Sequence, residues 1–150
     1  MKQQLRFLLV LLSVNFFLFS SCNKDDNPPA PKTKTQLLTQ GSWKYKSSTV
    51  GGAPYTLQAC QQDNIYTFTA SGNGTIDEGP AKCNAADLQN RPFTWNFQSG
   101  ETMLYISTVL FSGGSNTFTL ESLTETEAII SQGITLGGGP TQNVVVTFMH

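Results

Sequence analysis

The sequence predicts an all-β domain, and three observations lead to that prediction. Apolar and polar residues alternate with period 2 through eight short segments, as they do in strands that bury one face. Gly, Asn and Ser separate these segments as turn residues, and no stretch of ten residues keeps a helical period. The domain is also rich in Thr, Ser, Gly, Phe and Val, a composition that is typical of β proteins.

The eight predicted strands follow one another closely along the chain. They are expected at residues 43–49, 65–70, 75–78, 93–97, 104–106, 118–120, 127–135 and 144–148. Residues 71–74 read Ser-Gly-Asn-Gly, and they should close a tight hairpin because Gly and Asn tolerate positive φ. The best candidate for a helical turn is the segment 57–62.

Short connections between consecutive strands predict an antiparallel up-and-down arrangement. An open sheet of this kind would leave two edges exposed, whereas closing eight strands into a barrel removes both of them. A barrel of eight strands has room inside for side chains or for one small ligand. A two-sheet sandwich remains the alternative.

The first 22 residues predict a secretory signal that ends in a lipid attachment site. Lys2 and Arg6 precede an apolar run of 13 residues at 7–19, which is short of the roughly 20 residues of a permanent membrane helix. Residues 19–22 read Phe-Ser-Ser-Cys and resemble the bacterial lipobox, in which the cysteine takes a diacylglycerol. Cys22 is therefore the predicted lipid attachment site. The alternative is a plain signal peptide with a chance cysteine.

The residues after Cys22 predict a flexible tether, because they are polar, rich in proline and without a large apolar side chain. The domain boundaries follow: a signal peptide at 1–21, a lipidated N-terminus and tether at 22–35, and a β domain at 36–150. Lys24-Asp25-Asp26 resembles the export signal of surface lipoproteins in Bacteroidota. The expected location is the outer membrane, with the domain facing the cell exterior.

Assigning Cys22 to lipid leaves Cys60 and Cys83 as a pair in an oxidising compartment, where disulfides persist. The segment 60–83 would close a loop of 24 residues, worth about 3 kcal/mol. A metal site at these cysteines lacks ligands, because the only histidine is His150 at the end of the chain. Two free thiols remain the alternative to the disulfide.

Charge and residue types exclude several function classes. From residue 36 onward, four basic and eight acidic residues give a formal charge of −4, so no basic surface is available for nucleic acid. A nucleophilic triad is not expected, since His150 is terminal and alone. Asp77 and Glu78 are adjacent on a strand and point to opposite faces, so they cannot flank one glycosidic bond. Asp63-Asn64 is a weak candidate for calcium. We expect no enzyme, no metal and no cofactor.

Two sets of residues resemble the lipocalin-like domain of small Bacteroidota lipoproteins. Gly41-Ser42-Trp43 looks like the Gly-x-Trp motif, whose Trp closes one barrel end in lipocalins. The second set is Cys60-Gln61-Gln62-Asp63-Asn64, Phe68, Gly72, Glu78-Gly79, Cys83, Trp95, Leu104, Ile106 and Leu123-Thr124. The resemblance covers residues 37–148 and implies a lipocalin-like barrel. One departure is that the last strand, 143–149, has no Arg or Lys to pack on the motif Trp.

Two functions are compatible with this reading. In the first, the barrel binds a small apolar molecule, with Tyr45, Phe68, Trp95 and Phe97 as candidate lining residues. In the second, aromatic side chains fill the barrel, and its loops bind a protein or glycan, as in an inhibitor of an enzyme. The expected partners are thus the membrane, through the N-terminal lipid, and either a small ligand or a surface molecule. We expect a monomer.

Overall fold

The computed structural model describes residues 29–135 and 137–150. Residues Lys32–His150 form one compact unit that holds all the described strands and the whole described core. Because its core lies within it, this unit can fold on its own. In the described part of the chain, no helix has the length and apolarity needed to cross a membrane. The predicted signal peptide, Cys22 and the Lys24-Asp25-Asp26 run lie outside the described residues.

The eight predicted strands are all present, and a short ninth accompanies them. The strands are β1 (Ser42–Val50), β2 (Ala53–Tyr55), β3 (Ile65–Phe68), β4 (Asn73–Asp77), β5 (Asn90–Gln98), β6 (Met103–Ile106), β7 (Thr117–Leu123), β8 (Glu127–Ile134) and β9 (Gln142–Met149). The predicted helical turn is α3 (Ala59–Gln62). A second helix, α2 (Lys34–Thr39), was not predicted, because six residues are too few to reveal a helical period.

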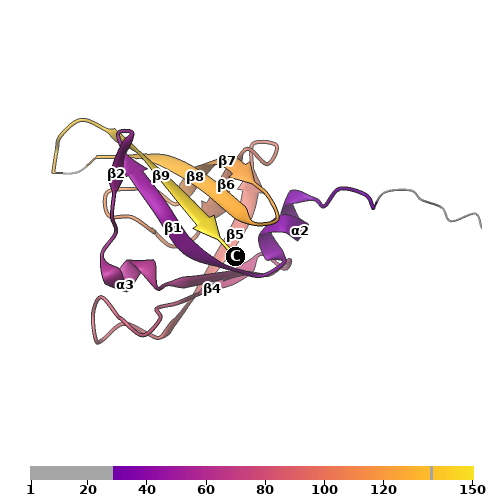
Figure 1. Cartoon of the computed structure of the whole chain (residues 1–150), viewed down its shortest axis with the longest axis horizontal. Helices are drawn as coiled ribbons and strands as arrows, with labels where there is room; N and C mark the ends of the chain where they lie inside the picture. Colours follow the sequence, from indigo (N-terminus) through magenta and orange to yellow (C-terminus); the bar gives the residue numbers. More distant parts are fainter. Residues whose placement is uncertain (1–28, 136) are drawn as a thin grey trace, which may run out of the picture. The chain divides into compact units, whose positions relative to one another are not determined.

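The strands form one closed antiparallel barrel, so the prediction of an up-and-down barrel is confirmed and the sandwich alternative is wrong (Figure 1). Each strand from β3 onward pairs with the next, and β9 pairs back onto β1. Both β2 and β3 pair with β1, β2 along its C-terminal half and β3 along its N-terminal half. They share one strand position, interrupted by α3, and the barrel therefore has eight positions.

The two ends of the barrel differ. The helix α2 lies at one end, which we call the closed end, together with the start of β1. The turns that follow β1, β4, β6 and β8 lie at the opposite end, which we call the mouth, because neighbouring strands are antiparallel. Figure 1 shows α2 and α3 at opposite ends of the barrel.

A β-bulge in β1 changes which side chains face the interior. Its pairing with β9 slips by one residue between Tyr45 and Ser47. An extra residue in one strand reverses the alternation beyond it. The simple alternation predicts that Ser47 faces the same side as Trp43, but Ser48 is the buried residue instead. Its hydroxyl donates a hydrogen bond to the carbonyl oxygen of Tyr55 at 2.7 Å, which satisfies the buried group.

Candidate ligand site at the mouth of the barrel

The closed end is sealed by the motif residue Trp43, whose side chain is 1% exposed. Its indole Nε1 donates a hydrogen bond to the carbonyl oxygen of Leu38 at 2.8 Å. Leu38 is the buried residue of α2, which begins with a capping box formed by Thr33 and Gln36. The Thr-x-x-Gln spacing is the sequence signal that could have revealed this helix. The helix thus places an apolar plug over the end of the barrel.

His150 packs on the outer face of Trp43, with ring centroids 3.7 Å apart and planes tilted by 34°. Its Nδ1 donates to the carbonyl oxygen of Ser42 at 3.0 Å. A Cβ on Gly41 would lie 3.1 Å from the His150 ring, so the glycine of the motif leaves room for this contact. The last strand lacks Arg and Lys, but the C-terminal histidine lies where the resemblance places a basic residue.

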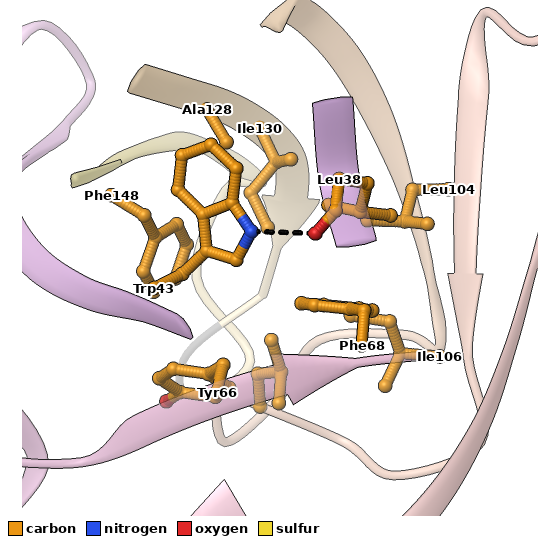
Figure 2. Close-up of a pocket in the computed structure, with 10 residues that line it drawn as sticks. Leu38, Trp43, Tyr66, Phe68, Leu104, Ile106, Ala128, Ile130 and Phe148 are labelled. Carbon is orange, nitrogen blue, oxygen red and sulfur yellow. Dashed lines mark hydrogen bonds between the residues drawn. The ribbon is translucent and has the colours of Figure 1, made fainter. Parts of the chain in front are cut away.

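The barrel interior is almost completely filled by side chains. A cavity of about 20 Å³ lies inside the barrel, next to Trp43 and Phe68 (Figure 2). That volume admits about one water molecule and no organic ligand. The cavity is lined by Leu38, Trp43, Tyr66, Phe68, Leu104, Ile106, Leu110, Ala128, Ile130 and Phe148. This cavity is too small for a ligand of the size that lipocalin barrels hold.

Of the four predicted lining residues, Phe68 lines one of the three hollows described here. Phe68 lines the small interior cavity, and its ring meets those of Phe93 and Trp95 edge to face. Trp95 donates its indole N–H to the carbonyl oxygens of Thr69 and Asn73, near the closed end. Tyr45, Trp95 and Phe97 line none of the three hollows described here. They contribute to the packed core or its margin instead.

Two larger hollows open at the mouth and adjoin each other. Both are lined by Leu57, Gln61 and Phe111, which stand between them. The first, the polar hollow, has a volume of about 200 Å³ and is further lined by Asn64, Tyr66, Glu78, Cys83, Asp87, Arg91 and Leu110. The second, the apolar hollow, has a volume of about 240 Å³ and is further lined by Val50, Tyr55, Gln58, Ser112, Ile134 and Val144.

Tyr66 and Leu110 form the floor between the mouth and the interior, since both line the polar hollow and the interior cavity. The ring of Tyr66 packs edge to face on Phe148 with centroids 5.1 Å apart. Burial raises the pKa of the Tyr66 phenol, and the nearby Glu78 carboxylate adds to the rise. The Asn64 side chain and the Arg91 guanidinium oppose it. The phenol thus stays neutral at physiological pH.

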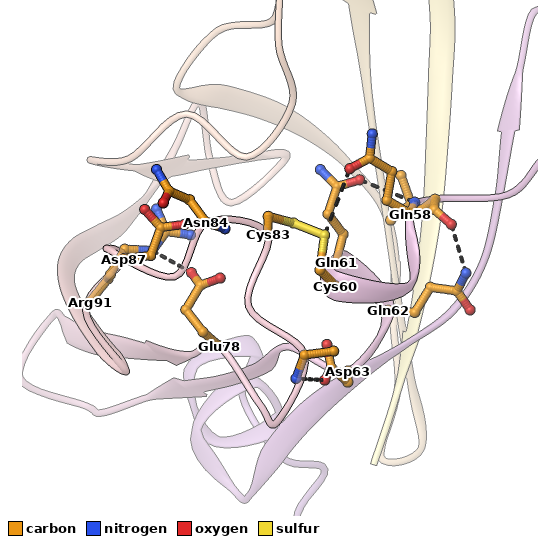
Figure 3. Close-up of a disulfide and its surroundings, with 12 residues drawn as sticks. Gln58, Cys60, Gln61, Gln62, Asp63, Glu78, Cys83, Asn84, Asp87 and Arg91 are labelled. Atoms are coloured by element: carbon orange, nitrogen blue, oxygen red, sulfur yellow. Dashed lines mark hydrogen bonds and ion pairs between the residues drawn. A yellow bond between two sulfur atoms is a disulfide. The ribbon is translucent and has the colours of Figure 1, made fainter.

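Charged groups gather on one wall of the polar hollow. Glu78 is only 3% exposed, and its carboxylate forms an ion pair with Arg91, the partner that a buried charge requires (Figure 3). Asp87 lies beside this pair and accepts a hydrogen bond from the backbone N–H of Asn84. Asn64 is 5% exposed, and its Oδ1 has no hydrogen-bond partner among the described residues.

The predicted disulfide between Cys60 and Cys83 is present, with Cα atoms 5.0 Å apart, and it joins two walls of the mouth (Figure 3). Cys60 lies in α3 and Cys83 in the connection between β4 and β5. Asp63 accepts a hydrogen bond from the backbone N–H of Ala81 at 2.8 Å, which ties the same two segments together. Gly79 has a φ of +63°, and a Cβ there would lie 2.7 Å from Asp63. These motif residues therefore shape the mouth.

The acidic residues that the sequence singled out as metal ligands or as a carboxylate pair lie apart in the structure. Across the described residues, no three His, Cys, Asp or Glu side chains are grouped as metal ligands. Asp77 and Glu78 diverge: Glu78 lines the polar hollow, whereas the Asp77 carboxylate accepts hydrogen bonds from Gln89 and Gly79 outside it. Those bonds, with the Gln89 contact the larger effect, lower the pKa of Asp77.

The sequence of the barrel was compared with models of known protein families. Residues 39–127 match the family model described as a lipocalin-like domain. The chain belongs to the lipocalin-like domain family. Barrels of this architecture typically hold one small hydrophobic ligand. The resemblance drawn from Gly41-Ser42-Trp43 and the cysteine-containing motif is thereby confirmed. No curated protein sequence matches this lipocalin-like chain.

Among solved structures, the lipocalin-like chain is similar to the odorant-binding protein from bovine nasal mucosa. The two are 14% identical with a TM-score of 0.46, over 80% of this chain and 74% of that chain. A complex of bovine odorant-binding protein with undecanal gives 13% identity and a TM-score of 0.45 over the same shares. At these values the similarity says nothing about the ligand of this chain.

Proposed function

We propose that this chain is a lipid-anchored binding protein that holds a small, mainly apolar molecule at the mouth of its barrel. The observation that carries the proposal is the contrast between the filled interior, with about 20 Å³ of space, and the two adjoining hollows of about 200 and 240 Å³. A ligand would lie above the floor made by Tyr66 and Leu110. The barrel then serves as a rigid support for a site made by its loops.

The apolar hollow supplies the hydrophobic wall that such a ligand needs. Val50, Ile134 and Val144 come from strands, and Phe111 comes from the connection between β6 and β7. Small-molecule sites usually combine apolar side chains of this kind with a few polar groups that orient the ligand. Glu78, Arg91 and Asn64 supply such groups in the adjoining hollow. An apolar wall beside a polar wall suits a binding protein that acts as a monomer and does not catalyse a reaction.

A dye-binding measurement tests the proposed site. The unit Lys32–His150 should enhance the fluorescence of N-phenyl-1-naphthylamine, an apolar dye. Ser112→Trp should reduce this binding about tenfold or more, because Ser112 is exposed and its new ring would occupy the apolar hollow. Thr119→Trp is the matched control, since Thr119 is exposed on β7, away from the mouth. A protein that does not bind the dye, or equal binding by both variants, would contradict the proposal.

The membrane anchor is the second part of the proposal and rests on the sequence of residues 7–26. Cells grown with an alkyne-labelled fatty acid should incorporate the label into the wild-type chain. Cys22→Ser should remove the label, while Cys83→Ser should keep it. Protease treatment of intact cells then tests the outward orientation predicted from Lys24-Asp25-Asp26, and a fully protected domain would contradict it.

A second function is favoured by two exposed apolar side chains at the mouth. Leu88, between β4 and β5, is 68% exposed, and Val109, between β6 and β7, is 49% exposed. Large apolar side chains on loops at one end of a rigid barrel suit contact with a protein or glycan. If the loops bind such a partner, Leu88→Ser with Val109→Ser should abolish surface binding and leave dye binding unchanged.

A further inference from the structure

We infer that the ligand is a glycolipid-like amphiphile, whose uncharged sugar head group occupies the polar hollow while its alkyl tail lies in the apolar hollow. The inference rests on the proposed function, because it specifies the head group of a ligand at the same site. The two hollows share Leu57, Gln61 and Phe111 in their linings. One molecule can therefore reach both hollows.

The charges around the polar hollow balance one another. Glu78 and Asp87 are acidic, and Arg91 and the adjacent Lys82 are basic, so their formal charges cancel. Arg91 pairs with Glu78, and the Lys82 ammonium donates a hydrogen bond to the backbone carbonyl oxygen of Asp87 at 2.8 Å. A charged head group would lose its water and gain no unbalanced partner, whereas an uncharged head group loses less on entry.

Hydrogen-bond donors and acceptors both remain unused in the polar hollow. Glu78 is 3% exposed, and its Oε1 accepts from Arg91, while its Oε2 accepts from no described residue (Figure 3). Arg91 donates through Nε, and its two Nη groups donate to no described residue. Gln61 accepts through Oε1 from the backbone N–H of Gln58, and its Nε2 donates to no described residue.

These unused atoms can be reached by a ligand. Three side-chain atoms of the described residues are buried without a partner, and none of them belongs to Glu78, Gln61 or Arg91. The Oε2 of Glu78, the Nε2 of Gln61 and the Nη groups of Arg91 therefore keep accessible surface. All three residues line the polar hollow, so a head group in it can bond to them.

Unused donors and acceptors in one hollow select a hydroxylated head group. A hydroxyl both donates and accepts hydrogen bonds, whereas an ammonium only donates and a carboxylate only accepts. An ammonium would leave the donors of Arg91 and Gln61 unpaired, and a carboxylate would leave the Glu78 acceptor unpaired. Desolvating a polar group without giving it a partner is costly, so hydroxyls fit this lining best.

The size of the polar hollow favours several hydroxyls over one. Its volume is about 200 Å³, against about 20 Å³ for the interior cavity that admits about one water molecule. A single hydroxyl at the end of an alkyl tail would reach only some of the unused atoms. A sugar ring carries hydroxyls in several directions, so it can bond to Glu78, Gln61 and Arg91 together.

The alkyl tail has a wall of its own. Val50, Ile134 and Val144 line the apolar hollow and belong to β1, β8 and β9. Glu78 follows β4 and Arg91 lies in β5, so the polar wall comes from other strands. The residues common to both hollows lie between these walls, which lets one amphiphile place its head group and its tail on different sides of them.

Calorimetric titration at pH 7 with amphiphiles that share an eight-carbon tail tests the inference on the unit Lys32–His150. Octyl glucoside, used below its micelle concentration, should bind at least about tenfold more tightly than octanol, octylamine or octanoate, which is the effect of about two additional hydrogen bonds. Arg91→Lys keeps a positive charge beside Glu78 but removes the forked guanidinium. It should therefore reduce the preference for octyl glucoside over octanol about fivefold or more.

A second variant tests the sugar contacts without changing the ion pair. Gln61→Met keeps the length of the side chain but removes its donor, and it should reduce the same preference about threefold or more. Gln98→Met is the matched control, because Gln98 is exposed at the end of β5, away from the mouth. The control should keep the full preference for octyl glucoside.

The outcomes separate this inference from the proposed function. Octyl glucoside that binds no more tightly than octanol, octylamine or octanoate would overturn the sugar assignment and leave ligand binding at the mouth intact. A preference that is unchanged in both Arg91→Lys and Gln61→Met would do the same. A protein that binds neither these amphiphiles nor N-phenyl-1-naphthylamine would overturn the proposed function, and the sugar assignment with it.

Discussion

Replacement of both disulfide cysteines by serine should weaken the fold and the mouth together. The bond joins α3 to the connection between β4 and β5, and Cys83 itself lines the polar hollow. Leu57 and Gln61, which line both hollows, lie in the segment that carries Cys60. The hydrogen bond from the backbone N–H of Ala81 to Asp63 also joins these two walls of the mouth.

The expected loss of stability follows from the loop that the bond closes. The cysteines are separated by 23 positions, so the loop has 24 residues when both ends are counted. In the chain-entropy account, a crosslink of that span stabilises the folded state by about 3 kcal/mol. For a domain of this size, a loss of about 3 kcal/mol lowers the melting temperature by roughly 10 °C.

Urea unfolding followed by tryptophan fluorescence measures the loss directly. Trp43 and Trp95 are both buried in the barrel core, so their emission reports on the barrel rather than on the mouth. The double variant should unfold at lower urea than the wild type. Wild-type protein treated with a reductant should show the same loss, while the reductant should leave the double variant unchanged.

A loss below about 1 kcal/mol would show that the loop is already ordered without the bond, and it would refute the entropic reasoning. Dye binding gives a second reading of the same variant. We expect the folded variant to bind the dye more weakly. Its mouth should adopt more conformations, so a smaller fraction of the molecules is competent to bind. Unchanged dye affinity would indicate that other contacts between these segments, such as the hydrogen bond of Ala81 to Asp63, keep the two walls in place.

Three further predictions concern the closed end and the floor of the mouth. Trp43→Phe should lower the free energy of unfolding by about 3 kcal/mol in urea titrations, since it leaves the Leu38 carbonyl unpaired and adds space to the core. His150→Ala should cost about 1 kcal/mol in the wild type and much less in the Trp43→Phe background, as a double-mutant cycle would measure. Burial raises the pKa of Tyr66 above its unfolded value, so its neutral form stabilises the fold fully below pH about 10. That stabilisation is lost as pH rises through the folded pKa. Between pH 9 and 11, the free energy of unfolding should therefore fall less for Tyr66→Phe than for the wild type.

Short sequence patterns predict much of the barrel. The alternation in Phe93-Thr94-Trp95-Asn96-Phe97 predicts β5 because side chains of a strand point alternately to two faces. The Ser-Gly-Asn-Gly run predicts the hairpin between β3 and β4 because its residues accept the backbone angles of a tight turn. Each signal lies within about ten residues, and neighbouring residues determine it.

The residues of the candidate site were harder to predict from the sequence than the strands. Tyr45, Trp95 and Phe97 look like lining residues because they are aromatic and alternate, but that pattern equally describes a filled core. Leu57, Phe111 and Asn64, which shape the mouth, lie in or beside irregular connections and carry no periodic signal. Whether a barrel is hollow depends on the summed volumes of side chains from every strand, and no single segment encodes that sum.

The sequence by itself predicted eight of the nine strands, favoured the pairing of Cys60 with Cys83 and resembled the lipocalin-like family. Only the tertiary structure decided that β9 closes on β1, that His150 lies on Trp43, and that the open space lies at the mouth rather than inside. His150 and Trp43 are more than one hundred residues apart in the chain and meet only after the barrel closes. Strand formation follows from local backbone and side-chain preferences, whereas closure and cavity volume follow from packing among distant residues.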